Sequence, residues 1–144
     1  MRDMALLRRR PRLAFQADRR LYRAVAKNKG SPAEAAADAA ALLDGWEADL
    51  EGLVERGAIR GLLSGWANVG HSRILVRYWL AREAGQDDEH AKATSGYSQS
   101  ISLFDEYTEA LAQGDERRTR AGEKLSRLWN LPIPEQIKTS TEHR

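Results

Sequence analysis

Apolar side chains recur every three or four residues along most of this chain, which is the spacing of one face of an α-helix. No stretch alternates β-branched residues with polar ones as a half-buried strand does. The pattern therefore predicts an all-α fold. The clearest helix spans residues 32–56, because Ser31, Pro32 and Glu34 form a capping box with proline at the first helical position. Its expected buried stripe is Ala35, Ala39, Leu42, Trp46, Leu50 and Leu53, and Gly57 is its expected end.

An earlier helix is expected to begin after Pro11 and to end near Asn28, before Gly30. Its apolar stripe is Leu13, Ala17, Leu21 and Ala24 or Val25. Residues 58–84 are also helical in pattern, but Gly61, Gly65 and Gly70 each weaken a helix by roughly 1 kcal/mol relative to alanine. We therefore expect a break at residues 68–71, with Ser72 capping a second piece. The stretch 73–80 is the most apolar and is expected to lie at the centre of the core.

The rest of the chain predicts two more helices. Residues 86–96 are polar and are expected to form a surface connection with at most one helical turn. A helix over 98–113 is expected to bury Ile101, Phe104, Tyr107 and Leu111. A last helix over 115–130 is expected to bury Ala121, Leu125, Leu128 and Trp129. Residues 131–134 end it, and the last ten residues are polar and expected to be disordered.

A chain of 144 residues normally folds around one hydrophobic core. The expected architecture is thus an all-α, single-domain bundle of about five helices with a basic N-terminal arm. Residues 1–11 form the arm, residues 12–131 the bundle, and residues 132–144 a polar C-terminal tail. Since no apolar run approaches the roughly 20 residues that span a bilayer, we expect no membrane association and a cytoplasmic protein.

Charge is distributed unevenly, although the formal net charge is only +2. Residues 1–29 hold ten basic and two acidic side chains, a local excess of eight positive charges. Residues 31–56 hold seven acidic side chains and one arginine, a local charge of −6. Such segregation carries more functional information than the total.

The basic N-terminal region predicts contact with the phosphate backbone of DNA or RNA, without sequence specificity. Arg12, Arg19, Arg23 and Lys27 share one helical face, and Arg20 lies beside it. The candidate nucleic-acid-binding residues are Arg8, Arg9, Arg10, Arg12, Arg19, Arg20, Arg23 and Lys27. An internal alternative is that this helix pairs with Glu47, Glu51 and Glu55, whose four-residue spacing should direct them to water or to a basic neighbour.

Catalytic and metal-binding patterns are weak. The absence of cysteine excludes disulfides, thiolate zinc sites and cysteine nucleophiles. Asp87 and His90 are spaced for one helical turn, but no second cluster supplies further ligands. His71 lies near Asn68 and Ser72 without a clear nucleophile–base arrangement. We expect no cofactor, no metal and no enzymatic activity, and we expect the four tryptophans to pack in the core.

Two glycine patterns permit other interpretations. Residues 58–84 resemble a helix-turn-helix in outline, but Trp66 and His71 stand where the motif needs a small and an apolar residue. Gly61 and Gly65 permit a close helix crossing, either within the core or at a homodimer seam.

The leading hypothesis is therefore a non-enzymatic, nucleic-acid-associated protein of a bacterium or phage. The alternative is a protein-interaction or assembly subunit, or an inhibitor of a partner enzyme. In that case the charge-segregated helices would contact an acidic protein surface, or would contact one another in a homo-oligomer. An enzyme using His71 or the Asp87–His90 cluster is a third class.

Overall fold

The computed structural model describes residues 25, 27–111 and 115–138. Every element of secondary structure in this part is a helix, which confirms the predicted all-α bundle. The helices are α3 (Pro32–Glu55), α4 (Leu62–Glu83), α5 (Asp88–Ser95), α6 (Tyr97–Ala110), α7 (Asp115–Trp129) and α8 (Glu135–Lys138). The predicted arm over 1–11 and the first helix as far as residue 24 lie outside the described residues.

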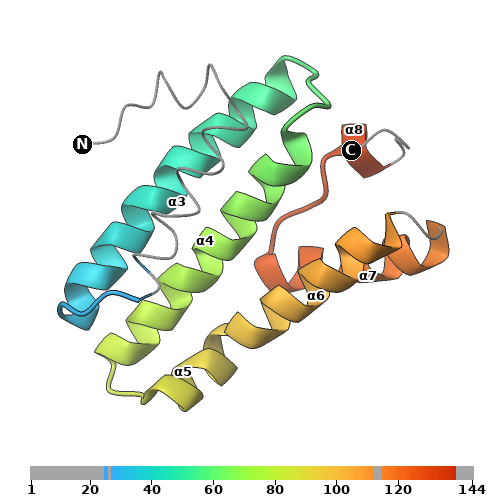
Figure 1. Ribbon diagram of the computed structural model, residues 1–144. Coiled ribbons are helices and arrows are strands. Elements are labelled where there is room, and N and C mark those ends of the chain that lie inside the picture. Colours follow the sequence, from blue (N-terminus) through green and yellow to red (C-terminus); the bar gives the residue numbers. More distant parts are fainter. Residues whose placement is uncertain (1–24, 26, 112–114, 139–144) are drawn as a thin grey trace.

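The long helices α3 and α4 run antiparallel and pack along each other, and the α6–α7 pair lies beside α4, on the side away from α3 (Figure 1). The start of α3 agrees with the prediction: Ser31 is the N-cap, its hydroxyl accepts from the Glu34 N–H at 3.1 Å, and Pro32 opens the helix. Ala35, Ala39, Leu42, Trp46 and Leu53 of the predicted stripe are buried, and Leu50 is partly buried.

The predicted break at residues 68–71 is wrong, because α4 continues through Gly70. A Cβ at position 70 would lie 2.1 Å from Cδ2 of Trp129, so the glycine leaves room for the indole ring. The same continuity rules out the helix-turn-helix interpretation. Gly65 serves a similar purpose at the α3–α4 crossing, where Leu53 Cδ1 would lie 3.1 Å from an added Cβ. Gly61 precedes α4 with a left-handed φ of 82°.

The segment 86–96 is more regular than expected. It holds the two-turn helix α5, which Asp87 caps by accepting from the His90 N–H at 2.8 Å. In α6 Tyr107 is buried as predicted, and Phe104 and Leu111 are partly buried. The prediction is wrong for Ile101, which is 45% exposed, while the neighbouring Ser100 is buried. In α7 Ala121, Leu125 and Trp129 are buried as predicted.

The core consists of contiguous apolar clusters along α4. One joins α3 and Val25 to α4, and the next joins α4 to α6 and α7. All four tryptophans are buried, as expected for core packing. The expected disorder of the last ten residues is wrong for 135–138, because Ile137 is buried against Leu53 and Leu62. Residues 139–144 lie outside the described part.

None of the described helices combines the length and the apolar character that crossing a bilayer requires.

Candidate functional site

A groove lies along the second half of α3, between that helix, α4 and the segment that follows α7. Its volume is about 320 Å³. The residues that line it are Glu47, Leu50, Glu51, Val54, Glu55, Val69, Arg73 and Leu131. The floor is apolar, and three glutamates four residues apart stand along one wall because they share a face of α3. We call this surface the α3–α4 groove.

Hydrogen bonds from α4 fix the shape of the groove. Arg73 donates to the backbone carbonyls of Trp129 at 3.1 Å and Asn130 at 2.5 Å, and it pairs with Glu47 at 3.1 Å. Arg77 donates to the carbonyl of Leu128 at 2.8 Å. These carbonyls lie at the C-terminal end of α7. The last carbonyls of a helix have no N–H donor within the helix, and they attract positive charge.

The wall formed by Leu131 is held in the same way. Trp66 Nε1 donates to the Leu131 carbonyl at 3.3 Å, and the Leu131 N–H donates to the Ser126 carbonyl at 3.0 Å. The groove is therefore preformed, so a ligand would not have to order this wall on binding.

The groove combines an apolar lining that is exposed at Val54, partly buried at Leu50 and Leu131 and fully buried at Val69 with two acids that have no ion pair in the described part. Val54 is 41% exposed, although valine is usually buried. Within the described part, Glu51 and Glu55 are exposed and have no ion pair, while Glu47 is paired with Arg73. An apolar strip flanked by such acids can accept a segment that carries apolar side chains next to basic ones.

Most residues of the sequence-predicted nucleic-acid site cannot be placed. Arg8, Arg9, Arg10, Arg12, Arg19, Arg20 and Arg23 lie outside the described residues, and Lys27 is exposed. One structural fact bears on the alternative of internal pairing: Glu47 forms its ion pair with Arg73 of α4, on the groove side of α3. The arm-to-acid pairing of Glu51 and Glu55 remains a prediction.

A second basic surface escaped the sequence analysis. Arg120, Lys124 and Arg127 are exposed and lie at helical spacing along α7. Arg120 is paired with Glu116 at 4.0 Å. The signal in the sequence is the three-to-four-residue spacing of these cations, which is weaker than the excess of eight positive charges at residues 1–29.

His71 lies in a partly buried polar contact with Ser100 and Trp129. Its Nδ1 lies 3.0 Å from Oγ of Ser100, and Trp129 Nε1 donates to the same oxygen at 2.7 Å. The rings of Phe104 and Trp129 stand edge-on to the imidazole, with centroids 5.4 and 5.1 Å away. Burial lowers the pKa of His71 to about 4, so the ring is neutral at pH 7, and the tautomer of the ring decides whether Nδ1 donates to or accepts from the Ser100 hydroxyl. Ser100 is fully buried, and the His71 side chain is partly exposed.

The Asp87–His90 cluster is distributed over separate contacts. Asp87 caps α5, while Asp88 accepts from the hydroxyl of Tyr78 and pairs with Lys92 at 3.1 Å. The hydrogen bond from Tyr78, followed by that from Lys92, lowers the pKa of Asp88. Among the described residues, no group of three or more histidines and acids is arranged to hold a metal ion.

Comparison with known proteins identifies no relative of this chain. No family model and no curated protein matches the sequence, and no solved structure matches the fold.

Proposed function

We propose that the protein is a non-enzymatic interaction module whose α3–α4 groove receives a basic segment with apolar anchor residues from a protein partner. The observation that carries the proposal is the exposed apolar floor at Val54 beside two acids, Glu51 and Glu55, that have no ion pair in the described part. Apolar anchors would supply affinity, and the acids would supply orientation and rate of association.

The dimensions of the groove favour this use. At about 320 Å³ it stands at the lower end of the volumes of ligand pockets. Such a space suits a few apolar side chains of a peptide segment. A small-molecule substrate would in addition need converging catalytic groups, and the His71–Ser100 pair lies under Trp129 instead.

The test uses a labelled, synthetic 18-residue peptide with leucines on one helical face and lysines on the other. Fluorescence anisotropy at low and high salt measures its affinity for the full chain. We expect Glu51→Lys/Glu55→Lys to weaken binding roughly tenfold or more, because two ion pairs of up to about 1 kcal/mol each give way to repulsion. Val54→Asp should weaken it as well, since it places a charge on the exposed floor.

The matched control is Glu83→Lys/Glu123→Lys, which makes the same change in net charge at two exposed sites outside the groove. It should bind the peptide nearly as the natural chain does. Equal loss of affinity in the two double variants would show a general charge effect and would refute the groove as the binding site.

A second candidate function is association with nucleic acid. The local excess of eight positive charges at residues 1–29 favours it, and so does the exposed row Arg120, Lys124 and Arg127 on α7. Mixed-sequence duplex DNA, duplex RNA and single strands would be titrated at two salt concentrations. The substitution of Arg8, Arg9, Arg10 and Arg12 by glutamate should abolish binding without unfolding the domain. Retained binding would exclude these arginines as the contact.

A further inference from the structure

We infer that the segment received by the α3–α4 groove is residues 4–12 of a second copy of this chain. The inference rests on the proposed function and names the partner. Residues 4–7 are Met-Ala-Leu-Leu, and residues 8–12 are Arg-Arg-Arg-Pro-Arg. This segment thus offers two adjacent leucines followed at once by four positive charges.

The groove matches that order of side chains. Leu50, Val54, Val69 and Leu131 line its apolar part, and Glu51 and Glu55 stand exposed along the α3 wall. Leu6 and Leu7 would contact the floor, and the following arginines would meet the glutamates with bidentate geometry available to each guanidinium. The Arg73–Glu47 pair closes the other wall and keeps one acid out of competition.

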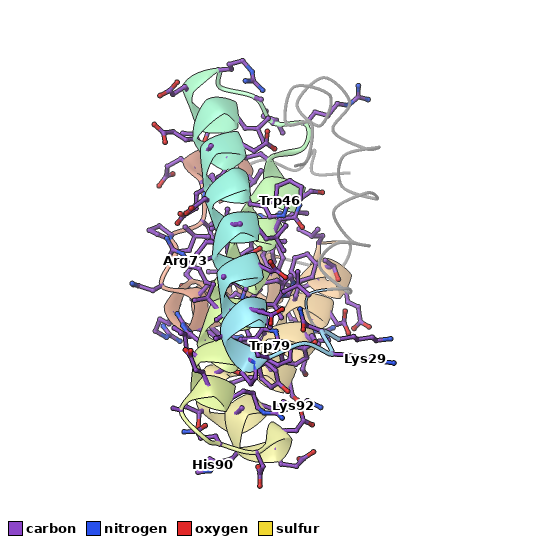
Figure 2. All side chains as sticks on the ribbon, turned by 90° about the vertical axis from the view of Figure 1, so that its left-hand side faces the viewer. Lys29, Trp46, Arg73, Trp79, His90 and Lys92 are labelled. Atoms are coloured by element: carbon purple, nitrogen blue, oxygen red, sulfur yellow. The ribbon has the colours of Figure 1, made fainter. Side chains whose placement is uncertain are left out.

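The position at which the chain enters the bundle favours a second copy over the same chain. Trp79 Nε1 donates to the Val25 carbonyl at 3.0 Å, and Asn28 Nδ2 lies 3.5 Å from Asp38 of α3. The Asn28–Asp38 contact is at the N-terminal half of α3 and Trp79 is in the C-terminal half of α4, whereas the groove begins at Glu47. Figure 2 shows Lys29, the residue after Asn28, and Trp46 to one side of α3, and Arg73 of the groove to the other side.

A contact of this kind is head-to-tail, because each copy contributes one segment and one groove that differ from each other. Such contacts close into rings or extend into open chains. Self-association should therefore rise with protein concentration and fall with salt, since the charges involved are exposed.

The test is sedimentation velocity on full-length chains. The natural chain should form dimers and larger species at low salt and dissociate at high salt. Leu6→Asp/Leu7→Asp removes the segment, and Glu51→Lys/Glu55→Lys removes the groove; each variant alone should be monomeric. An equimolar mixture of the two retains one working segment and one working groove, so it should give a 1:1 dimer and nothing larger.

The control Glu83→Lys/Glu123→Lys should self-associate as the natural chain does. Monomeric behaviour of the natural chain, or a mixture that stays monomeric, would overturn the inference. Larger species in the mixture would do the same, because only one complementary pair is left.

The labelled peptide of residues 1–14 separates this inference from the proposed function. The Leu6→Asp/Leu7→Asp chain should bind it at least tenfold more tightly than a peptide with both leucines replaced by aspartate. If that chain binds the leucine–lysine peptide but not residues 1–14, the inference fails and the proposed function stands. If it binds neither, both fail.

Discussion

Replacing Gly70 by alanine should destabilise the protein, although helix propensity alone predicts the opposite. Gly70 lies in the interior of α4, where the exchange of glycine for alanine normally stabilises by up to about 1 kcal/mol. The added Cβ would, however, lie 2.1, 2.2 and 2.5 Å from three carbon atoms of the Trp129 ring. Ordinary carbon–carbon contacts are about 3.5–4.0 Å, so the ring or the helix must move by more than about 1 Å.

The ring has little freedom to move. Trp129 is fully buried, donates to Ser100 at 2.7 Å and packs edge-on against Trp66 with centroids 4.7 Å apart. Overpacking in such a setting costs about 3 kcal/mol, which the gain in helix propensity reduces to a net loss of about 2 kcal/mol. For a chain of this size, that loss lowers Tm by roughly 5–10 °C.

Urea unfolding followed by far-ultraviolet circular dichroism measures the effect as a fall in the midpoint at unchanged slope. Gly52→Ala is the matched control, since its Cβ would meet only the flexible end of Arg56, at 3.3 Å. It should leave the protein equally stable or slightly more stable. If Gly70→Ala is as stable as the natural chain, the close contact between α4 and Trp129 is refuted.

Two further predictions follow from contacts of α4. Folding lowers the pKa of His71 from 6.5 to about 4, so between these pH values the unfolded chain binds more protons than the folded chain. The contribution of this group to stability is therefore complete above pH 6.5 and is lost as the pH falls toward 4. Between pH 6.5 and pH 4 the free energy of unfolding of the natural chain should fall by up to about 3 kcal/mol more than that of His71→Asn. A difference between the two chains that stays constant with pH would refute this prediction. Arg73→Met should cost about 2–3 kcal/mol because three acceptors lose their donor, whereas the exposed Arg60→Met should be nearly neutral in the same unfolding assay.

The elements that sequence could predict are those determined by neighbouring residues. Ser31 and Pro32 define the start of α3 without help from other parts of the chain, and the apolar stripe of α3 follows from its period. In the stretch 73–80, Ile74, Leu75, Tyr78 and Trp79 are buried as expected, because α4 packs against both α3 and the α6–α7 pair, but Leu80 is 50% exposed.

The errors have a different cause, since they depend on residues far apart in sequence. Gly70 reads as a helix breaker until Trp129, 59 positions later, is placed on it. The apolar pattern predicts Ile101 in the core and omits Ser100, whose burial depends on hydrogen bonds with His71 and Trp129. Propensity and periodicity carry no information about such contacts.

The candidate site was visible only in part for the same reason. The four-residue spacing of Glu47, Glu51 and Glu55 placed the acids on one face of a helix, with water or a basic neighbour as the expected surroundings. The neighbour of Glu47 proved to be Arg73, and the apolar floor adds Val69 and Leu131 from two other segments. The pairing of acid wall and apolar floor therefore required the fold.

The most direct test of the proposed interaction is a site-specific cross-link from the segment to the groove. A benzophenone amino acid would replace Leu7 in a full-length chain, mixed with an equal amount of isotope-labelled natural chain and irradiated at low salt. Mass spectrometry would identify the joined residues and separate links between copies from links within one. We expect links between copies at Leu50, Val54 or Leu131. Links confined to one copy, or to residues outside the α3–α4 groove, would contradict the proposal.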